Sequence, residues 1–139
     1  MISGIARYLH EIPITIVVEP DSAACVMESI KSGKIKKIDI KRESLMGGMS
    51  CGEVSLVPWE ILKHSVKHCL SLPDDDIAQK SIDGDNSAPG VISLIAICQD
   101  EIIRNKLNLN KNSNVLVFGC EGDTDKDMYK KLINQKFKN

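Results

Sequence analysis

The sequence predicts an α/β fold, with an open and largely parallel sheet that carries helices on both faces in a three-layer sandwich. Short apolar or β-branched runs alternate with segments of helical periodicity, which is the pattern of β–α–β units. The run from Val115 to Phe118 is continuously apolar, as expected of a strand covered on both faces. With 139 residues, 42% of them hydrophobic, the chain suits a single domain, 1–139.

The first half of the chain begins with helical periodicity and then becomes rich in β-branched residues at Ile14 to Glu19, which predicts a strand. Asp21 or Ser22 is a suitable N-cap for the next helix. Gly33 ends that helix, and alternating residues after it predict a half-exposed strand. The expected helices cover 2–11, 21–31 and 55–69, the last with Pro58 in its first turn, and the expected strands cover 14–19 and 36–40.

The second half continues the alternation. A loop is expected at 83–87 from its composition, Asp-Gly-Asp-Asn-Ser, and an apolar helix follows it. A polar helix beginning at Asp100 leads to the continuously apolar strand. The expected strands cover 70–72 and 115–118, and the expected helices cover 74–82, 91–97, 100–107 and 126–137.

Charge and hydropathy exclude two classes of partner. The net charge is -1, which argues against an electrostatic nucleic-acid binder. No stretch of 18 apolar residues and no signal peptide are present, so we expect a soluble, cytoplasmic protein without a membrane partner. The basic run lacks interleaved aromatic residues and is expected to be a solvated loop and strand edge: Lys31, Lys34, Lys36, Lys37, Lys41 and Arg42.

Cysteines and histidines do not form a metal-ligand pattern. His64 and His68 are spaced i, i+4 on an expected helix, but no third ligand accompanies them, so no metal site is predicted. Chain reversal could bring Cys51 and Cys69 together, although separate reduced thiols are favoured in a cytosolic protein. The five cysteines fit reduced thiols: Cys25, Cys51, Cys69, Cys98 and Cys120.

Two glycine-containing turns are the candidate ligand sites. Residues 45–53, Leu-Met-Gly-Gly-Met-Ser-Cys-Gly-Glu, would let a ligand approach the backbone closely, although a hinge or plain loop has the same composition. Residues 119–125, Gly-Cys-Glu-Gly-Asp-Thr-Asp, follow the apolar strand, where α/β sheets bind ligands. Thr124 or Asp125 would also cap the next helix. We expect residues 47–49, 85–87 and 119–123 to converge at the carboxyl ends of the strands.

In this order the segments resemble the carboxyl-terminal part of the diaminopropionate ammonia-lyase family of fold-type-II pyridoxal-phosphate enzymes. The resemblance covers nearly the whole chain, and its specificity comes from the combination of motifs. The matching segments are Ile-Val-Val-Glu-Pro at 16–20, Met-Gly-Gly-Met-Ser-Cys-Gly-Glu at 46–53, Trp-Glu-Ile-Leu at 59–62, 84–90, Val-Leu-Val at 115–117 and Glu-Gly-Asp-Thr-Asp at 121–125.

The resemblance implies pyridoxal 5'-phosphate as cofactor and a set of residues beside it. Gly47, Gly48 and Met49 correspond to a wall beside the cofactor ring. Asp85 stands where the family has the glutamate of a Gly-Glu-Ser motif, and is one methylene shorter. Gly119 and Cys120 stand where the family places the serine or threonine that faces the ring nitrogen. The segment between Asp76 and Gly84 is about ten residues shorter than in the family pattern.

The resemblance also implies a lyase that converts 2,3-diaminopropionate, a small amino acid, to pyruvate and ammonia. The family's Schiff-base lysine comes from the amino-terminal half, and none of the 18 Lys and Arg residues lies in a matching motif. We therefore expect no catalytic residue here and a chain that is inactive alone. Alternatives are a non-catalytic partner-binding remnant or one chain of a split, threonine dehydratase-like enzyme. Its expected partner is a second copy or a separate amino-terminal half.

Overall fold

The computed structural model describes residues 13–76 and 88–118. The helices expected at 2–11 and 126–137, the loop at 83–87 and most of the helix expected at 74–82 lie outside these described residues. Three of the predicted site residues, Asp85, Gly119 and Cys120, also lie outside them.

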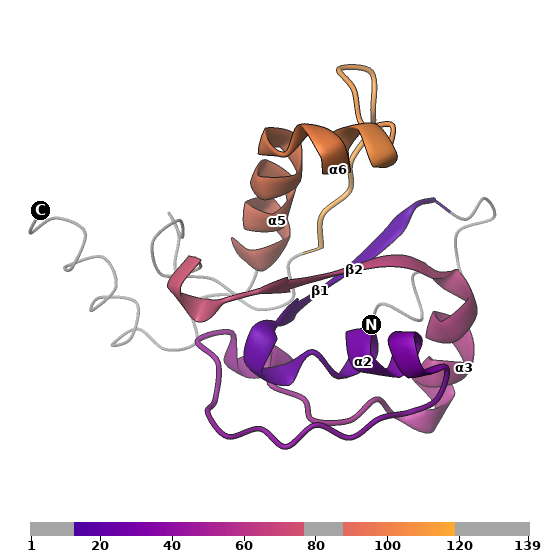
Figure 1. Ribbon diagram of the computed structural model, residues 1–139, viewed down its shortest axis with the longest axis vertical. Coiled ribbons are helices and arrows are strands. Elements are labelled where there is room, and N and C mark those ends of the chain that lie inside the picture. The colour runs from indigo at the N-terminus through magenta and orange to yellow at the C-terminus, as the bar shows by residue number, and fades with distance from the viewer. Residues whose placement is uncertain (1–12, 77–87, 119–139) are drawn as a thin grey trace, which may run out of the picture.

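Two parallel strands form the sheet of the described region, β1 (Thr15–Pro20) and β2 (Val66–Leu72). Between them the chain passes through the 3-10 turn η1 (Asp21–Ala23), α2 (Cys25–Ser32), η2 (Gly47–Met49) and α3 (Leu56–Ser65). After β2 come α5 (Ala88–Gln99) and α6 (Glu101–Lys106). Figure 1 shows α2 and α3 on one side of the strands and α5 and α6 on the other. The predicted α/β class with a parallel sheet is confirmed.

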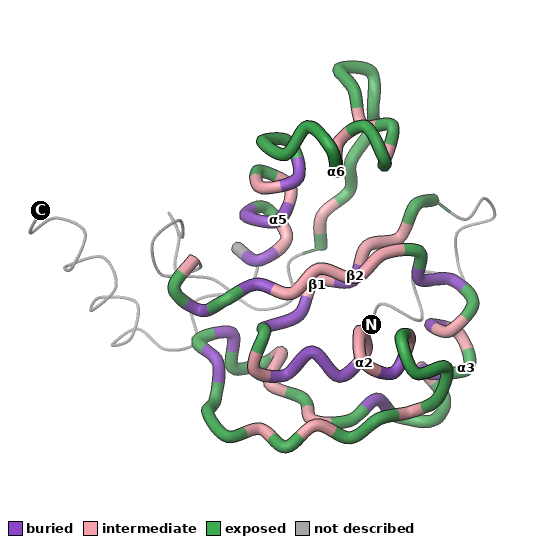
Figure 2. Tube along the Cα trace, in the orientation of Figure 1, coloured by how far each residue is buried: buried purple, intermediate pink, exposed green. Residues whose placement is uncertain are grey.

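The core forms two clusters, one on each face of the sheet, because neighbouring strand residues point to opposite faces. Val17 packs in one cluster with residues of α2 and α3, and Val18 packs against the other with Ile92 of α5. The buried members of the first cluster are Val17, Cys25, Val54, Trp59, Leu62 and Val66, and those of the second are Met46, Leu72 and Ile92. Figure 2 shows that burial is concentrated along the strands and facing helices, whereas α6 and the loop after it are mostly exposed.

The cap of α2 differs from the prediction. Asp21 lies in η1, and the helix begins only at Cys25. The Glu19 carboxylate, at the end of β1, accepts hydrogen bonds from the backbone amides of Val26 and Met27, each at 2.8 Å. The carboxylate thus satisfies amides that have no partner within the helix. Gly33 ends α2 with a φ of 70°, as predicted.

The strand predicted at 36–40 is not formed. Ile38 of this run and Ile35 just before it contact the first core cluster, while Lys36 and Lys37 between them are exposed. This segment is held to the chain that follows η2 by a 2.7 Å hydrogen bond from the Ile38 amide to the Gly52 carbonyl. A Cβ at Gly52 would approach the Ile38 carbonyl oxygen to 2.8 Å, so the close approach requires glycine.

The boundary between α3 and β2 was also predicted wrongly. The helix ends at Ser65 and the strand extends from Val66, because pairing with β1 begins there. His64 and His68 therefore lie on different elements rather than one helical face. None of the described helices combines the length and the apolar character needed to span a membrane.

The segment 115–118 is not a buried strand. Leu116 is 70% exposed and Phe118 45%, and no strand of the described region pairs with them. Val117 is the exception, since its Cγ1 atom would lie 2.4 Å from a Cβ built on Gly90 of α5. The helix predicted at 100–107 is confirmed as α6, with the Asp100 side chain accepting from the Ile103 amide at 2.9 Å.

Candidate functional site

The glycine turn, residues 44–51, is a compact loop with an exposed tip and a buried base. Three short-range bonds shape it: Met49 N to Met46 O at 2.8 Å, Ser50 N to Gly47 O at 3.1 Å and Cys51 N to Met49 O at 2.8 Å. Gly47 and Gly48 are exposed, whereas Met46 is 1% exposed and packs with Leu72 and Ile92. The turn is thus anchored in the second core cluster with its glycines facing outward.

A buried carboxylate holds the first residues of the turn. Asp74 Oδ1 accepts from the Ser44 hydroxyl at 2.5 Å and from the Leu45 amide at 3.2 Å. The Arg42 guanidinium donates to Asp74 Oδ2 at 3.4 Å. Ser44 continues the network, because its hydroxyl oxygen accepts from the Met46 amide at 3.0 Å. A side chain beyond β2 therefore fixes a turn that lies before α3.

This network places the turn at the carboxyl edge of the sheet. The last residues of the two strands, Pro20 and Leu72, are register partners, and Asp74 follows Leu72 by two residues. Ligands of open parallel sheets bind beyond this edge. Residues 47–49 lie where the sequence predicts, while the other two segments expected to converge there, 85–87 and 119–123, lie outside the described residues.

The space beside the Gly47 backbone is open. A Cβ built on Gly47 meets nothing within 4 Å, in contrast to Gly52 and Gly90, where it would clash. Gly47 is thus not required by packing within the described structure, and its small size leaves the backbone open to approach. Met49 is half-buried and packs against the second core cluster at the side of the turn.

The described cysteines are free thiols, and two of them are held in the protonated form. Burial, with the nearby Glu19 carboxylate and Cys51, raises the pKa of Cys25 to about 11. Burial and Glu19 raise the pKa of Cys69 to about 11 as well. Neither thiol is suited to be a nucleophile at neutral pH, since the thiolate is the reactive form. Cys51 and Cys69 are not joined by a disulfide.

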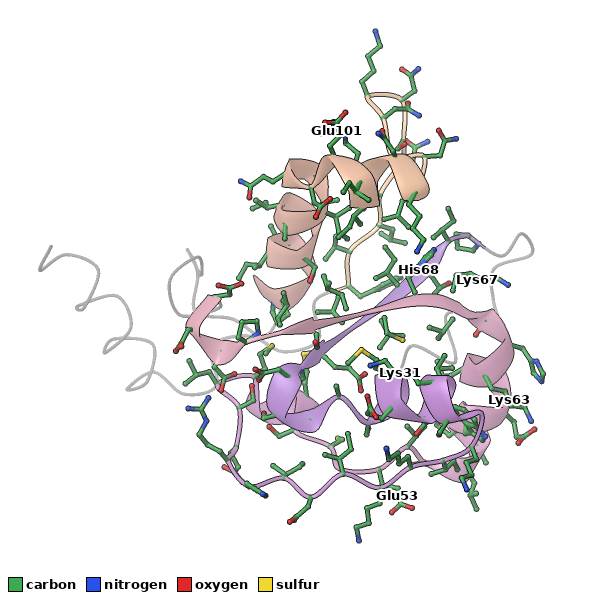
Figure 3. All side chains as sticks on the ribbon, viewed as in Figure 1. Lys31, Glu53, Lys63, Lys67, His68 and Glu101 are labelled. Atoms are coloured by element: carbon green, nitrogen blue, oxygen red, sulfur yellow. The ribbon has the colours of Figure 1, made fainter. Side chains whose placement is uncertain are left out.

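Other features of the described region give weaker support for a functional site than the glycine turn does. Within 13–76 and 88–118, no group of three His, Cys, Asp or Glu side chains could hold a metal ion. A shallow cavity of about 290 Å³, lined by Ile35 and residues 53–56, contains none of the predicted site residues. Figure 3 shows Lys63 and Lys67 at the amino end of β2, the end of the strand away from Asp74. The six basic residues of the predicted solvated run are all exposed.

Sequence reasoning missed Ser44 and Asp74. Asp74 was expected only as the start of a helix, and Ser44 received no role. The sequence holds no direct signal for their contact, because 30 positions separate them. The only indication was an aspartate directly after the strand that ends at Leu72, at the edge where functional groups gather.

Known proteins similar to this chain were found by sequence and by structure. Diaminopropionate ammonia-lyase of Escherichia coli (strain K12) is 30% identical over 96% of this chain. The chain spans only 39% of the length of that relative. No family model matches.

Two solved structures show the same arrangement. Escherichia coli diaminopropionate ammonia-lyase in complex with D-serine superposes with a TM-score of 0.75 at 31% identity, covering 88% of this chain and 34% of that one. A threonine deaminase of T.th. superposes with a TM-score of 0.61 at 14% identity, covering 70% of this chain and 40% of that one, which shows a shared fold only.

Proposed function

Because this chain is a homologue of the diaminopropionate ammonia-lyases, with the fold of fold-type-II pyridoxal-phosphate enzymes, we propose that it forms one part of a pyridoxal-phosphate site in a carbon–nitrogen lyase. The proposed reaction is the conversion of 2,3-diaminopropionate to pyruvate and ammonia. The observation that carries the proposal is the glycine turn, anchored at the carboxyl ends of two parallel strands with open space above Gly47.

The described residues fit the cofactor at this turn. The planar pyridine ring of the cofactor needs a flat surface without side chains, and Gly47 and Gly48 provide exposed backbone. Met49 would border that surface with a flexible, polarisable side chain. Bound pyridoxal phosphate would supply an electron sink for a carbanion on the substrate. The residues of this chain would orient the ring and keep water from one of its faces.

We also propose that the 139 residues do not catalyse the reaction by themselves. The chemistry needs an amine to bind the cofactor and move a proton. Several described lysines are already engaged elsewhere, since Lys31 and Lys36 pair with Glu28, and Lys63 pairs with Glu60. None of the residues in the network that holds the glycine turn is a lysine. The reactive amine would come from another polypeptide segment.

A complementation assay tests both proposals. The chain alone should release no pyruvate from 2,3-diaminopropionate, and borohydride reduction with pyridoxal phosphate should label no single lysine stoichiometrically. Mixing it with the portion of the Escherichia coli enzyme outside the aligned 154 residues should restore pyruvate release. Pyruvate from the chain alone would refute the proposed inactivity, and an inert mixture containing both folded parts would count against a lyase role.

A matched pair of variants tests whether the cofactor binds against the glycine turn. Gly47→Leu fills the open space above the turn without a clash in the chain, and should abolish pyridoxal-phosphate binding by the mixture. Glu43→Leu places the same apolar side chain at an exposed position just before the turn, without filling the space beside Gly47, and should bind normally. Equal binding by both variants would mean that the cofactor does not lie against this turn.

A partner-binding role is the second candidate, and one helix face favours it. Val91, Ile95 and Cys98 lie at i, i+4 and i+7 on α5, and all three are exposed. The opposite face of α5 carries the buried Ile92 and Ile97. A helix that is apolar all round is normally buried on all sides. We propose that this exposed face packs against a second copy of the chain or a separate amino-terminal half.

Analytical ultracentrifugation tests this association. The wild-type chain should sediment as a dimer or larger species, and Ile95→Glu should shift it to a monomer because the charge would be buried in the interface. Ile102→Glu, at an 80% exposed position on α6 outside the i, i+4, i+7 face, is the control and should keep the association. Wild-type protein that remains monomeric at high concentration, with and without the complementing half, would contradict the proposal.

A further inference from the structure

We propose that Asp74 is the positioning residue of the glycine turn, an inference that rests on the proposed function. Its carboxylate is 5% exposed, and a buried carboxylate is stable only when donors surround it. Its Oδ1 atom serves the turn by accepting from Ser44 and Leu45, whereas its Oδ2 atom faces Arg42, which is 73% exposed. One carboxylate oxygen therefore holds the turn, and the other pairs with the arginine.

The Oδ1 contacts determine the shape of the turn through Ser44. The Ser44 hydroxyl donates to Asp74 and accepts from the Met46 amide, so it links the end of β2 to the residue that carries the buried base of the turn. The Ser44 amide donates to the Ser50 hydroxyl at 3.1 Å, which joins the two ends of the turn. Without Oδ1, the Ser44 hydroxyl and the Leu45 amide would lose their acceptor together.

Asp74 therefore acts on a ligand only through the turn. The side chain accepts hydrogen bonds from Arg42, Ser44 and Leu45 and is itself buried, so it has no free face for a cofactor. What it controls is where the exposed backbone of Gly47 and Gly48 stands relative to the carboxyl ends of β1 and β2. Loss of that control should disorder the turn while the strands stay paired.

Hydrogen exchange on the full chain separates this role from a general structural one. Asp74→Ala and Ser44→Ala should speed exchange of the amides in 44–51 by about tenfold or more relative to those of β1 and β2, since local opening is governed by local contacts. Asp74→Asn is the rescue variant, because an amide oxygen can replace Oδ1 and only the Arg42 contact is lost. Asp75→Ala, which removes an exposed neighbouring carboxylate, should exchange like the wild type.

Three exchange results would each overturn the inference: unchanged exchange of the turn in Asp74→Ala, acceleration of the strands by the same factor, or an Asp74→Asn variant that behaves like Asp74→Ala. Pyridoxal-phosphate binding by the complemented mixture is the second readout, and Asp74→Ala should weaken it by about tenfold. Selective opening of the turn with unchanged affinity would also overturn it. A wild-type mixture that binds no cofactor refutes the proposed function, while the exchange data still decide whether Asp74 holds the turn.

Discussion

Replacement of Glu19 tests how the amino end of α2 is joined to β1. Its carboxylate is 7% exposed and accepts from the Val26 and Met27 amides, each at 2.8 Å. Glu19→Ala leaves both amides without this acceptor, and an unsatisfied buried donor costs about 1–3 kcal/mol. Because both residues are only half-buried, water can reach their amides in part, and we expect the lower limit for each, a loss of about 2 kcal/mol in the free energy of unfolding.

Glu19→Gln separates the charge from the hydrogen bonds. The carboxamide keeps one acceptor oxygen, as the protonated carboxyl does, and carries no charge at any pH. Burial raises the pKa of the Glu19 carboxyl above its ordinary value, against the hydrogen bonds from Val26, Met27 and Cys25 that lower it. The folded state therefore binds more protons at this group than the unfolded state does. Stability from this group falls as pH rises from about 4.3 through the folded-state pKa.

Urea unfolding at a series of pH values measures both effects. The stability advantage of the wild type over Glu19→Gln should be largest near pH 4 and should shrink as pH rises. Glu43→Ala, at an exposed position, should stay within about 0.5 kcal/mol of the wild type. An advantage that grows with pH would show that the hydrogen bonds outweigh burial. A Glu19→Ala variant as stable as the wild type would show that the Glu19 carboxylate does not stabilise the amino end of α2.

Gly90→Ala should destabilise the chain by about 1–2 kcal/mol through its clash with Val117, and Val117→Ala should remove that cost in a double-mutant cycle; additive effects would mean that the two residues do not touch. Gly33→Ala should cost about 1 kcal/mol in urea unfolding because of its φ of 70°, so an unchanged midpoint would contradict a left-handed helix end. At pH 8, a thiol reagent should modify the exposed Cys51 and Cys98 first and Cys25 and Cys69 slowly, as read by peptide mass spectrometry, because the pKa values of the last two are raised to about 11; equal rates would contradict the raised pKa values.

The elements that were predicted correctly have local causes. The first four residues of β1, 15–18, are all β-branched. Gly33 supplies the left-handed end of α2, and Asp100 caps α6 with its own side chain. The errors arose where distant contacts decide the outcome. Residues 66–69 were expected to extend the helix, but they belong to β2, which pairs with β1. The alternating run at 36–40 has no partner strand in the described region, and its Ile38 packs against the core.

In the candidate site, too, residues marked by a local sequence pattern were recognised and residues that act through distant contacts were not. Gly47, Gly48 and Met49 were recognisable because three glycines within six positions are a local signal. Ser44 and Asp74 were not, because a hydrogen bond across 30 positions leaves no trace in either segment. Glu19 was similarly overlooked as a cap, since it lies seven residues before the first amide that it serves.

The contact between Asp74 and Ser44 also affects the order in which the chain can fold. All the glycines of the turn precede α3, but the carboxylate that holds the turn follows β2, so the Asp74–Ser44 hydrogen bond cannot form until the chain beyond β2 is present. Such long-range contacts form late, because the intervening chain must first be ordered. During synthesis, a nascent chain that ends before residue 74 would contain the entire glycine segment without its acceptor. If the proposed ligand binds at this edge, binding should begin only once the second strand is in place.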